Sequence, residues 1–512
     1  MEVRAADYGI VRGVRASRWL QEGAEASFAV CFAVIFVAGF AARCYGIANK
    51  PFWSDEATTI RRSGLPLCDL VRDSLLFHQL PAYYVVTSWV LPFGDTAFWV
   101  RLPAMLFGAL SCALAFAVAR SLGGMVAGLG AGLLVAFSPD MVQYGQDARC
   151  YSMLNCAILV ALWGLLALAR DPARAAKRFR ATDGRALAWA AYGFGTVAAL
   201  NLVADALLWL LASNLAAIAI ARQGAGRGFW RNWCLVQVLI LAACGPWFVA
   251  MMVSGPPGAL STLSWVPPMT WHRVWWTIAG DYFMVPTSIF PALVFSPGVP
   301  GLGLVVAAAG LAGVGALRRQ PAVLAVLAAA ALVPPLVIFA VSLVTPVLVP
   351  RYLLWGSLPV YLGAGLALGR LPARLQGPAL VVLGGLALAN LAPYYHVESN
   401  PRWDLAALDL QGGLQPGDLV VMENAREFTM LDFYCRRHPG LRQMRQWTAN
   451  VPAALRWQES GRRVWAVHAK AGQGEKLSDR QFVAELAGLG KPDLVERAGR
   501  DILIMRFDGG AE

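Results

Sequence analysis

Two adjacent carboxylates, Asp55 and Glu56, stand in the sequence PFWSDEATT directly after the first long apolar run. A carboxylate at a membrane–water interface beside Trp53 is partly desolvated, and such a group can act as a general base or bind a metal ion. Ser54 or Asp55 followed by Glu56 is also typical of a helix N-cap, and the pair taken alone favours this structural interpretation.

Further polar residues stand at the ends of later apolar runs. Arg101 opens a run in FWVRLPAM, and Arg351 opens another in LVPRYLLW, where Tyr352 follows it. A denser set lies between two runs in SPDMVQYGQDARCYS, namely Tyr144, Gln146, Asp147, Arg149 and Tyr151. Arginines at helix ends usually only snorkel, and Asp147 could simply pair with Arg149. Three arginines at external helix ends together indicate a phosphate site.

The histidines and cysteines are weaker candidates. His78 in FHQLPAYY is a candidate substrate-binding residue, although a single histidine in an apolar context more often serves as a hydrogen-bonded interface residue. His272 is flanked by tryptophans that are typical of a membrane interface, namely Trp265, Trp271, Trp275 and Trp276. None of the nine cysteines forms a C-x-x-C pair, so we expect small buried side chains rather than a metal or disulfide framework.

Long apolar runs must position these residues. The chain of 512 residues is 58% hydrophobic and 14% charged, whereas soluble domains carry about 25% charged residues. We therefore predict a polytopic α-helical membrane domain over residues 27–397, because a helix needs about 20 residues to cross the hydrocarbon core. The eleven spans that we predict are 27–47, 99–119, 124–138, 150–170, 187–203, 205–221, 233–253, 299–317, 322–344, 353–370 and 378–396. The shorter apolar segment 80–93 is expected to lie in the membrane plane or to re-enter it.

The charges orient these spans. Residues 398–512 contain 16 Lys or Arg and 16 Asp or Glu, so the net charge of +12 belongs to residues 1–397. The densest basic run, Arg170 to Arg185, is expected in the cytoplasm. This puts the tail 1–26 in the cytoplasm and the loops 48–98 and 254–298 outside. The segment 27–47 reads as a retained span, because it lacks the pattern of a cleavable signal.

The segment 398–512 has the pattern of a soluble domain. Short β-like runs at Asp418–Met422, Val464–Val467 and Ile502–Phe507 alternate with helical stretches at Leu405–Gly412 and Asp479–Leu489. This alternation predicts a small α/β domain. With eleven spans before it, the domain lies outside the membrane, in the periplasm of a bacterial cell.

Four ordered motifs resemble those of a known superfamily. PFWSDEATT, HQLPAYYVVTSWVLPFGDTAFWVRLPAMLFGAL, SPDMVQYGQDARCYSM and PRYLLWGSLPVYL resemble the GT-C glycosyltransferases, in particular the bacterial relatives of protein O-mannosyltransferases and of the lipid A aminoarabinose transferase. The similarity covers about residues 27–400. It implies a GT-C fold with about eleven spans and an inverting transfer of sugar from a polyprenyl phosphate to an acceptor outside the membrane.

The resemblance also implies roles for single residues. Asp55 matches the loop aspartate that deprotonates the acceptor, and Glu56 follows it as usual. Arg101 matches the arginine of an R-L-P motif that holds the carrier phosphate, and Arg351 with Tyr352 matches a late R-Y motif. The further candidates for binding the carrier phosphate or the sugar are His78, Gln146, Asp147, Arg149 and Tyr151. Fixed guanidinium groups would stabilise the charge that develops on the leaving phosphate.

The sequence departs from the pattern at three places. His78 to Tyr84 reads HQLPAYY where H-x-P-P-L-Y-Y is common, Asp147 stands where glutamate is frequent, and Ala199–Asp205 lacks an aromatic T-H-Y-F-like pattern. These departures affect the choice of sugar and acceptor more than the class of reaction. No clear group of metal ligands stands out, and the use of a divalent metal stays open.

We predict a glycosyltransferase of the cell inner membrane whose partners are a polyprenyl-phosphate sugar, membrane lipids and an acceptor that is a protein, a lipid or a polysaccharide. Nucleic acid is not expected as a partner, because the excess of basic residues is explained by membrane topology. No nucleotide-binding G-x-x-x-x-G-K-[ST] or G-x-G-x-x-G motif occurs in a suitable context. The alternatives are a transporter or flippase for lipid-linked saccharides, a catalytically inactive scaffold and, less favoured, a polyprenyl phosphotransferase.

Overall fold

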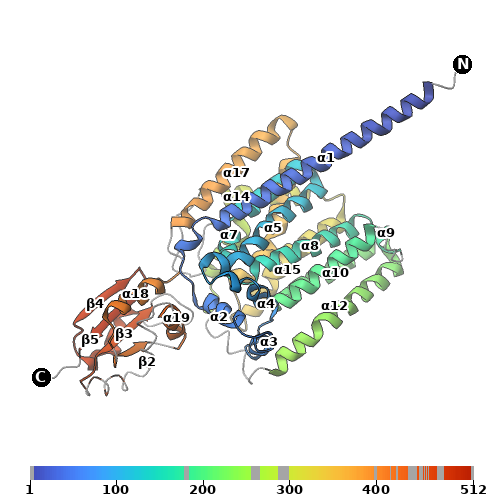
Figure 1. Ribbon diagram of the computed structural model, residues 1–512. Helices are drawn as coiled ribbons and strands as arrows, with labels where there is room; N and C mark the ends of the chain where they lie inside the picture. Colours follow the sequence, from blue (N-terminus) through green and yellow to red (C-terminus); the bar gives the residue numbers. More distant parts are fainter. Residues whose placement is uncertain are drawn as a thin grey trace.

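The computed structural model describes residues 5–177, 184–254, 266–285, 299–396 and, with short gaps, 400–508. A bundle of helices comes first in the chain, and a small sheet with its own helices lies at one end of that bundle (Figure 1). The bundle helices are α1 (Ala5–Cys44), α5 (Ala97–Gly123), α6 (Met125–Phe137), α7 (Pro139–Gly145), α8 (Tyr151–Arg170), α9 (Pro172–Ala175), α10 (Gly184–Leu202), α11 (Leu207–Ile220), α12 (Gly226–Ser254), α13 (Trp271–Phe283), α14 (Leu302–Gly315), α15 (Pro321–Ser342), α16 (Leu358–Gly369) and α17 (Ala373–His396).

Every predicted span coincides with a helix, but not every such helix is long or apolar enough to cross a membrane. Among the described residues, seven helices meet both criteria, or eight if the bent pair α6 and α7 forms one span. The axes of that pair differ by 61°. Helix α14 and the segment Leu354–Gly369 are apolar but shorter, as is Ala82–Phe93 in the region predicted to lie in the membrane plane. The predicted number of eleven spans is therefore not confirmed.

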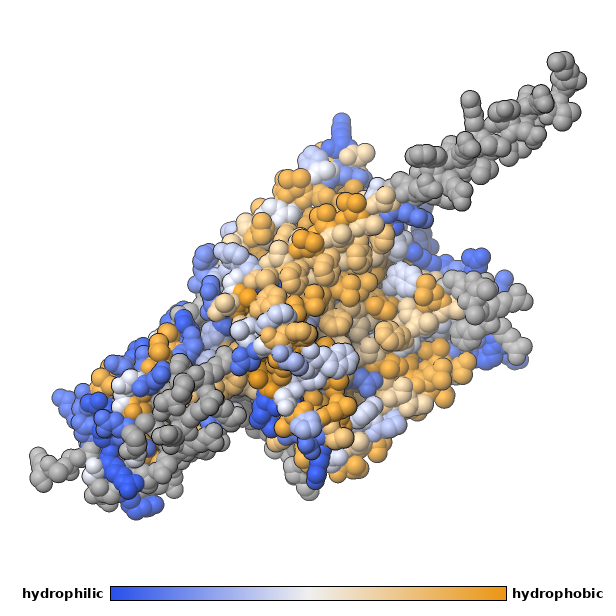
Figure 2. All heavy atoms as spheres, in the orientation of Figure 1, coloured by the Kyte–Doolittle hydropathy of each residue, from blue (hydrophilic) through white to orange (hydrophobic). Residues whose placement is uncertain are grey.

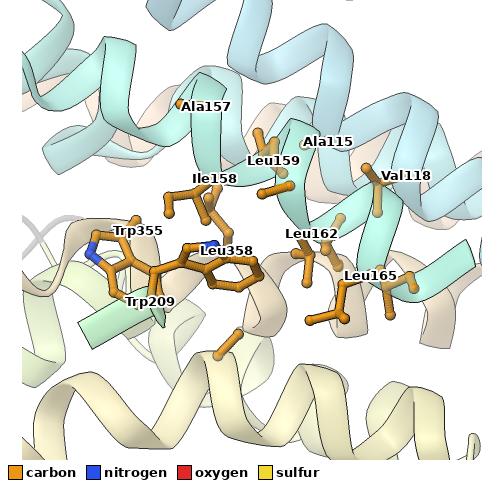
Figure 3. Close-up of a cluster of buried hydrophobic side chains, with 14 of the residues drawn as sticks. Ala115, Val118, Ala157, Ile158, Leu159, Leu162, Leu165, Trp209, Trp355 and Leu358 are labelled. Carbon is orange, nitrogen blue, oxygen red and sulfur yellow. The ribbon is translucent and has the colours of Figure 1, made fainter. Parts of the chain in front are cut away.

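The core of the bundle is apolar and closely packed. Trp209 of α11 meets Trp355, which precedes α16, with ring centroids 6.1 Å apart, beside leucines of α8 (Figure 3). Helices α14 and α16 approach so closely that a Cβ atom added to Gly313 would lie 1.7 Å from the carbonyl oxygen of Gly363. Only glycine fits at that position, and close backbone contact of this kind is typical of helices that pack within a membrane.

The surface divides by polarity. Hydrophobic residues cover the exposed sides of the bundle, whereas hydrophilic residues dominate the described surface of the C-terminal part (Figure 2). Leu311 of α14, Val381 of α17 and Val253 of α12 are each about three-quarters exposed. Apolar side chains in such numbers on an outer surface are expected where lipid is the solvent.

Three short helices link the first two long ones. They are α2 (Ser54–Ser63), α3 (Leu67–Leu76) and α4 (Ala82–Ser88), and they lie at the end of the bundle that faces the C-terminal sheet (Figure 1). Asp73 of α3 pairs with Arg61 and Arg62 of α2 at 3.0 and 2.7 Å, which ties the two helices together. This region is the predicted external loop 48–98.

A five-stranded mixed sheet forms the C-terminal part. Its order is β2–β1–β3–β5–β4, with β1 parallel to β2 and β3, and with β5 antiparallel to β3 and β4. The strands are β1 (Leu419–Met422), β2 (Trp447–Thr448), β3 (Val464–Ala469), β4 (Leu494–Ala498) and β5 (Ile502–Phe507), and the helices are α18 (Trp403–Gly413), α19 (Ala425–Cys435) and α21 (Asp479–Glu485). Alternate strand residues pack on opposite sides, for example Trp465 in the core with α18 and α19, and Val464 in the core with α21. The predicted small α/β arrangement is present.

Candidate functional site

Three charged side chains from distant parts of the chain meet at one point. The carboxylate of Asp55 lies 3.8 Å from Nε of Arg149 and 3.7 Å from Nη1 of Arg351. The side chain of Asp55 is 20% exposed, that of Arg149 13% and that of Arg351 5%. Two guanidinium groups that face one carboxylate in a place largely shielded from water favour an anionic ligand.

The local structure of α2 directs Asp55 toward the arginines. Trp53, and not Ser54 or Asp55, occupies the N-cap position, and its backbone N–H donates to Glu56 Oε2 at 3.3 Å. Glu56 therefore performs the capping, so the N-cap interpretation of Ser54 or Asp55 is wrong. Successive residues of a helix point about 100° apart. Asp55 thus faces a different direction from Glu56.

Glu56 forms a buried ion pair with Arg101. The guanidinium donates from Nε and Nη2 to the two carboxylate oxygens at 2.7 Å each. Its remaining N–H groups donate to the backbone carbonyls of residues 47, 50 and 51, at 3.0 to 3.2 Å. The N–H of Ala148 completes the shell of Glu56 at 2.9 Å. All five donors of Arg101 are used within the protein, which favours a structural role; its predicted role as a phosphate ligand stays a prediction.

Gln146 and Asp147 belong to the same framework. Gln146 donates to the carbonyls of Arg43 and Tyr45 at 2.9 and 2.7 Å and so holds the end of α1. Asp147 accepts a hydrogen bond from the indole of Trp53 at 2.8 Å. Burial, and next the nearby negative charge of Glu56, raise the pKa of Asp147 to about 8, so this side chain takes up a proton at neutral pH. Asp147 is close enough to Asp55 to interact with it electrostatically, whereas the contacts of Gln146 are with the end of α1 and with Tyr394.

Aromatic rings surround Arg351. The guanidinium of Arg351 lies 5.8 Å from the ring centroids of Trp53, Tyr151 and Tyr352. These are cation–π distances, and such contacts hold a buried guanidinium in place. The predicted candidates Tyr151 and Tyr352 are therefore brought to Arg351.

Arg149 is the last member of a chain of hydrogen bonds. Its Nη1 donates to the hydroxyl of Tyr84 at 3.1 Å, and that hydroxyl donates to Gln79. Gln79 also accepts from Arg62 at 2.5 Å, and Arg62 stacks over the ring of Tyr84 at 4.7 Å. Helices α2 and α4 thereby fix the direction of Arg149, while its Nε has no hydrogen-bond partner and can meet a ligand.

The two histidine candidates have other surroundings. His78 sits in a left-handed turn after α3, with φ of 53°, and none of its described contacts reaches Asp55 or either arginine. His272 accepts a hydrogen bond from Trp276 at 2.5 Å on the exposed side of α13. Trp265 lies outside the described residues. The structure thus gives neither histidine a place at the charged cluster.

Two residues at the cluster were not singled out by sequence reasoning. Tyr84 is part of the aromatic pattern HQLPAYY, which would have been a signal for it. Asp205 is the second residue of the segment Ala204–Gly224, and both of its carboxylate oxygens are buried without a hydrogen-bond partner. Arg351 and Tyr352 are close enough to Asp205 to interact with it electrostatically. An aspartate at the start of an apolar run looks like an ordinary helix end in a sequence.

Metal ligands do not gather in the part of the chain that the structure describes. No three His, Cys, Asp or Glu side chains there are placed to hold an ion together. All nine cysteines lie within the described residues, and each is free. The expectation of buried side chains holds for Cys112, Cys150, Cys156 and Cys244, whereas Cys68 and Cys234 are exposed.

Comparisons with known proteins identify the fold. No protein-family model matches the sequence, and no curated protein matches it. The structure of ArnT from Cupriavidus metallidurans in the apo state is similar over 96% of this chain and 100% of that one, with a TM-score of 0.63 and 16% identity. ArnT is a member of the GT-C superfamily. This chain has the GT-C fold.

Two further GT-C structures were determined with ligands. ArnT bound to undecaprenyl phosphate matches 93% of this chain and 97% of that one, with a TM-score of 0.56 and 16% identity. The oligosaccharyltransferase AglB from Archaeoglobus fulgidus, in complex with an inhibitory peptide and a dolichol-phosphate, matches 86% of this chain and 69% of that one, with a TM-score of 0.54 and 10% identity. The predicted GT-C fold is confirmed, and at these identities the likeness concerns the fold alone.

Proposed function

We propose that this chain is an inverting glycosyltransferase that moves a sugar from a polyprenyl phosphate to an acceptor at the external face of the bacterial inner membrane. The observation that carries the proposal is the placement of Asp55 between Arg149 and Arg351. A carboxylate base and two cations are what such a displacement requires, because one partner must lose a proton and the other must leave as a phosphate. ArnT bound to undecaprenyl phosphate, which shares the fold, supports the choice of carrier.

The reaction is a single displacement. Asp55 removes the proton from a hydroxyl or amine of the acceptor, and the freed electron pair attacks the anomeric carbon. The bond from that carbon to the phosphate oxygen breaks on the opposite face, so the anomeric configuration inverts. The electron pair of the broken bond stays on the polyprenyl phosphate, whose added negative charge Arg149 and Arg351 stabilise.

The distances suggest how the base is released. At 3.7 and 3.8 Å, the contacts of Asp55 with the arginines are longer than charge-assisted hydrogen bonds of about 2.7–2.9 Å. A phosphodiester that approaches the two guanidinium groups would compete with Asp55 for them. Donor binding would then free the carboxylate to accept a proton just when the donor is in place.

The membrane location supports the same proposal. Arg149 stands just before α8, and Asp205 lies near the start of the apolar segment Ala204–Gly224, so the cluster is at the ends of helices that are apolar enough to cross a membrane. An apolar carrier lipid would approach the cluster from the bilayer. The donor already carries an activated sugar, so the chain needs no nucleotide-binding fold. We place this end of the bundle and the sheet in the periplasm on the basis of the predicted topology.

The test uses the full chain purified in nanodiscs. We would offer a panel of radiolabelled polyprenyl-phosphate sugars together with a bacterial envelope extract as acceptor. The wild type is expected to transfer label, and Asp55→Asn to transfer it about 10²–10⁴-fold more slowly, the usual contribution of a general base. Asp69→Asn in α3, an exposed residue of the same loop, is the matched control and should retain activity.

A second pair of variants tests the phosphate site. Arg351→Gln should weaken the binding of polyprenyl phosphate, whereas Arg318→Gln, an exposed arginine elsewhere, should not. If the wild type consumes no donor, or if Asp55→Asn is fully active, the proposed reaction is wrong. In proteoliposomes, donor that crosses the bilayer without being hydrolysed or transferred would instead support the transporter.

A further inference from the structure

The C-terminal sheet and the segment that carries Asp55 share one hydrophobic core. Phe52 and Ala57, which flank the candidate base, are 3% exposed and pack in a cluster with Met430, Tyr434 and Trp465. Helix α19 lies directly against α2 (Figure 1). A soluble domain tethered only by a linker would not place its own core against the candidate active site.

Polar contacts fix the backbone just before α2. The N–H of Phe52 donates to the hydroxyl of Tyr434 at 2.5 Å, and that hydroxyl faces the carbonyl of Phe52 at 3.4 Å. The side-chain amide of Asn400, in the segment that leads into α18, donates to the carbonyl of Pro51 at 2.8 Å. The backbone three and four residues before Asp55 is therefore held by residues of the C-terminal part.

Two side chains contact the ring of Phe52 from different sides. Phe433 meets it edge to face with ring centroids 5.7 Å apart, and the guanidinium of Arg101 lies 4.9 Å from its centroid. Arg101 is itself fixed by Glu56, and Trp53 by Asp147. The short link between α1 and α2 is thus held both by the bundle and by the C-terminal part.

We propose that the C-terminal domain is a positioning element of the reaction, and that Tyr434 is the positioning residue through which it sets the direction of Asp55. The inference rests on the proposed function. The hydroxyl of Tyr434 accepts from the N–H of Phe52 and so fixes where α2 begins. The start of α2 in turn decides whether the carboxylate of Asp55 meets Arg149 and Arg351.

The test compares Tyr434→Phe with wild type in the full chain. The variant keeps the ring and removes the acceptor of the Phe52 N–H. We expect kcat for sugar transfer to fall about 10–100-fold, because misplacement of a reacting group by about 1 Å has effects of that size. The Kd for polyprenyl phosphate should stay within twofold, because the arginines are not displaced. Tyr45→Phe, a tyrosine whose side chain is 64% exposed, is the matched control.

Hydrogen exchange gives a second measurement that needs no activity. The amide of Phe52 should exchange faster in Tyr434→Phe, while amides in α8 stay unchanged. Asn400→Leu should act in the same direction, since it removes the contact with Pro51 without touching the core of the sheet.

Kinetics, lipid binding and exchange together separate the outcomes. A lower kcat with an unchanged Kd, an unchanged thermal midpoint and faster exchange at Phe52 supports the proposal. Unchanged kcat and exchange overturn it, as does a parallel loss of kcat, lipid binding and thermal stability, which would show a role in folding only. If the wild type transfers no sugar from any donor, the proposed function fails by itself, and the exchange measurement still decides whether Tyr434 orders the Asp55 segment.

Discussion

Replacing Arg101 should damage folding before it damages binding of the donor. Arg101→Met removes five hydrogen bonds, two to Glu56 and three to backbone carbonyls. Both side chains of the pair are almost fully buried, at 1% and 0% exposure. Breaking a buried pair by removing one partner costs about 3–5 kcal/mol, because it leaves an uncompensated charge.

The size of the effect follows from what remains around Glu56. After the substitution its carboxylate keeps two neutral donors, the N–H groups of Trp53 and Ala148. Glu56→Gln leaves the opposite charge unpaired and should destabilise by a similar amount. The double variant Glu56→Gln with Arg101→Met leaves no charge, so its loss of stability should be smaller than the sum of the single losses.

The assay heats each variant in detergent and measures the fraction that stays monodisperse. Binding of polyprenyl phosphate is measured separately at a temperature where every variant is folded. We expect Arg101→Met to lose stability and to bind the lipid normally when folded, and Arg318→Met to match the wild type in both. Normal thermal stability together with lost lipid binding would refute this reasoning and establish Arg101 as the phosphate ligand.

Three other outcomes are expected. Burial raises the pKa of Asp147 from an ordinary value of 3.8 to about 8 in the native state. The native state therefore binds more protons than the unfolded state, and the free energy of unfolding falls as pH rises from about 4 to about 8. Asp147→Asn should reduce this decline, as seen in thermal midpoints measured at pH 5 and pH 8. Tyr84→Phe, which removes a contact of Arg149, should raise the Kd for polyprenyl phosphate several-fold, and an unchanged Kd would contradict the role of that contact. Gly313→Leu, against Gly363, should destabilise by at least about 1–3 kcal/mol, seen as a lower thermal midpoint.

The charged cluster could be predicted because the polar residues are confined to the ends of long apolar runs. Arg149 and Arg351 stand beside the ends of such runs, and the ends of helices that cross a membrane in alternating directions gather at two surfaces. Counting the runs therefore placed both arginines on the side of Asp55. Strands β1, β3 and β5 were likewise predictable from their β-branched and apolar residues, as in Val464–Ala469, whereas β2 and β4 were not predicted.

The different contacts of Asp55 and Glu56 could not be predicted from the sequence. Whether Asp55 or Glu56 meets a given arginine depends on where α2 begins, and that point depends on Trp53 and on contacts from the far end of the chain. The sequence motifs make Arg101 and Arg351 equally good candidates for binding phosphate. In the structure, Glu56 and backbone carbonyls accept from all the N–H groups of Arg101, whereas Arg351 faces aromatic rings. The number of membrane spans could not be predicted either, because a run of apolar residues does not show where a helix begins and ends. Helix α14, for example, is shorter than the predicted span 299–317.

The contact between Phe52 and Tyr434 joins residues 382 positions apart. At the usual rate of about 5–20 residues per second, a ribosome needs roughly 20–80 s to reach the second residue after making the first. If the proposed function holds, the carboxylate of Asp55 is not yet held in its working position during that time. A chain that ends before α19 would then lack the contact between Phe52 and Tyr434 and would not complete the proposed site.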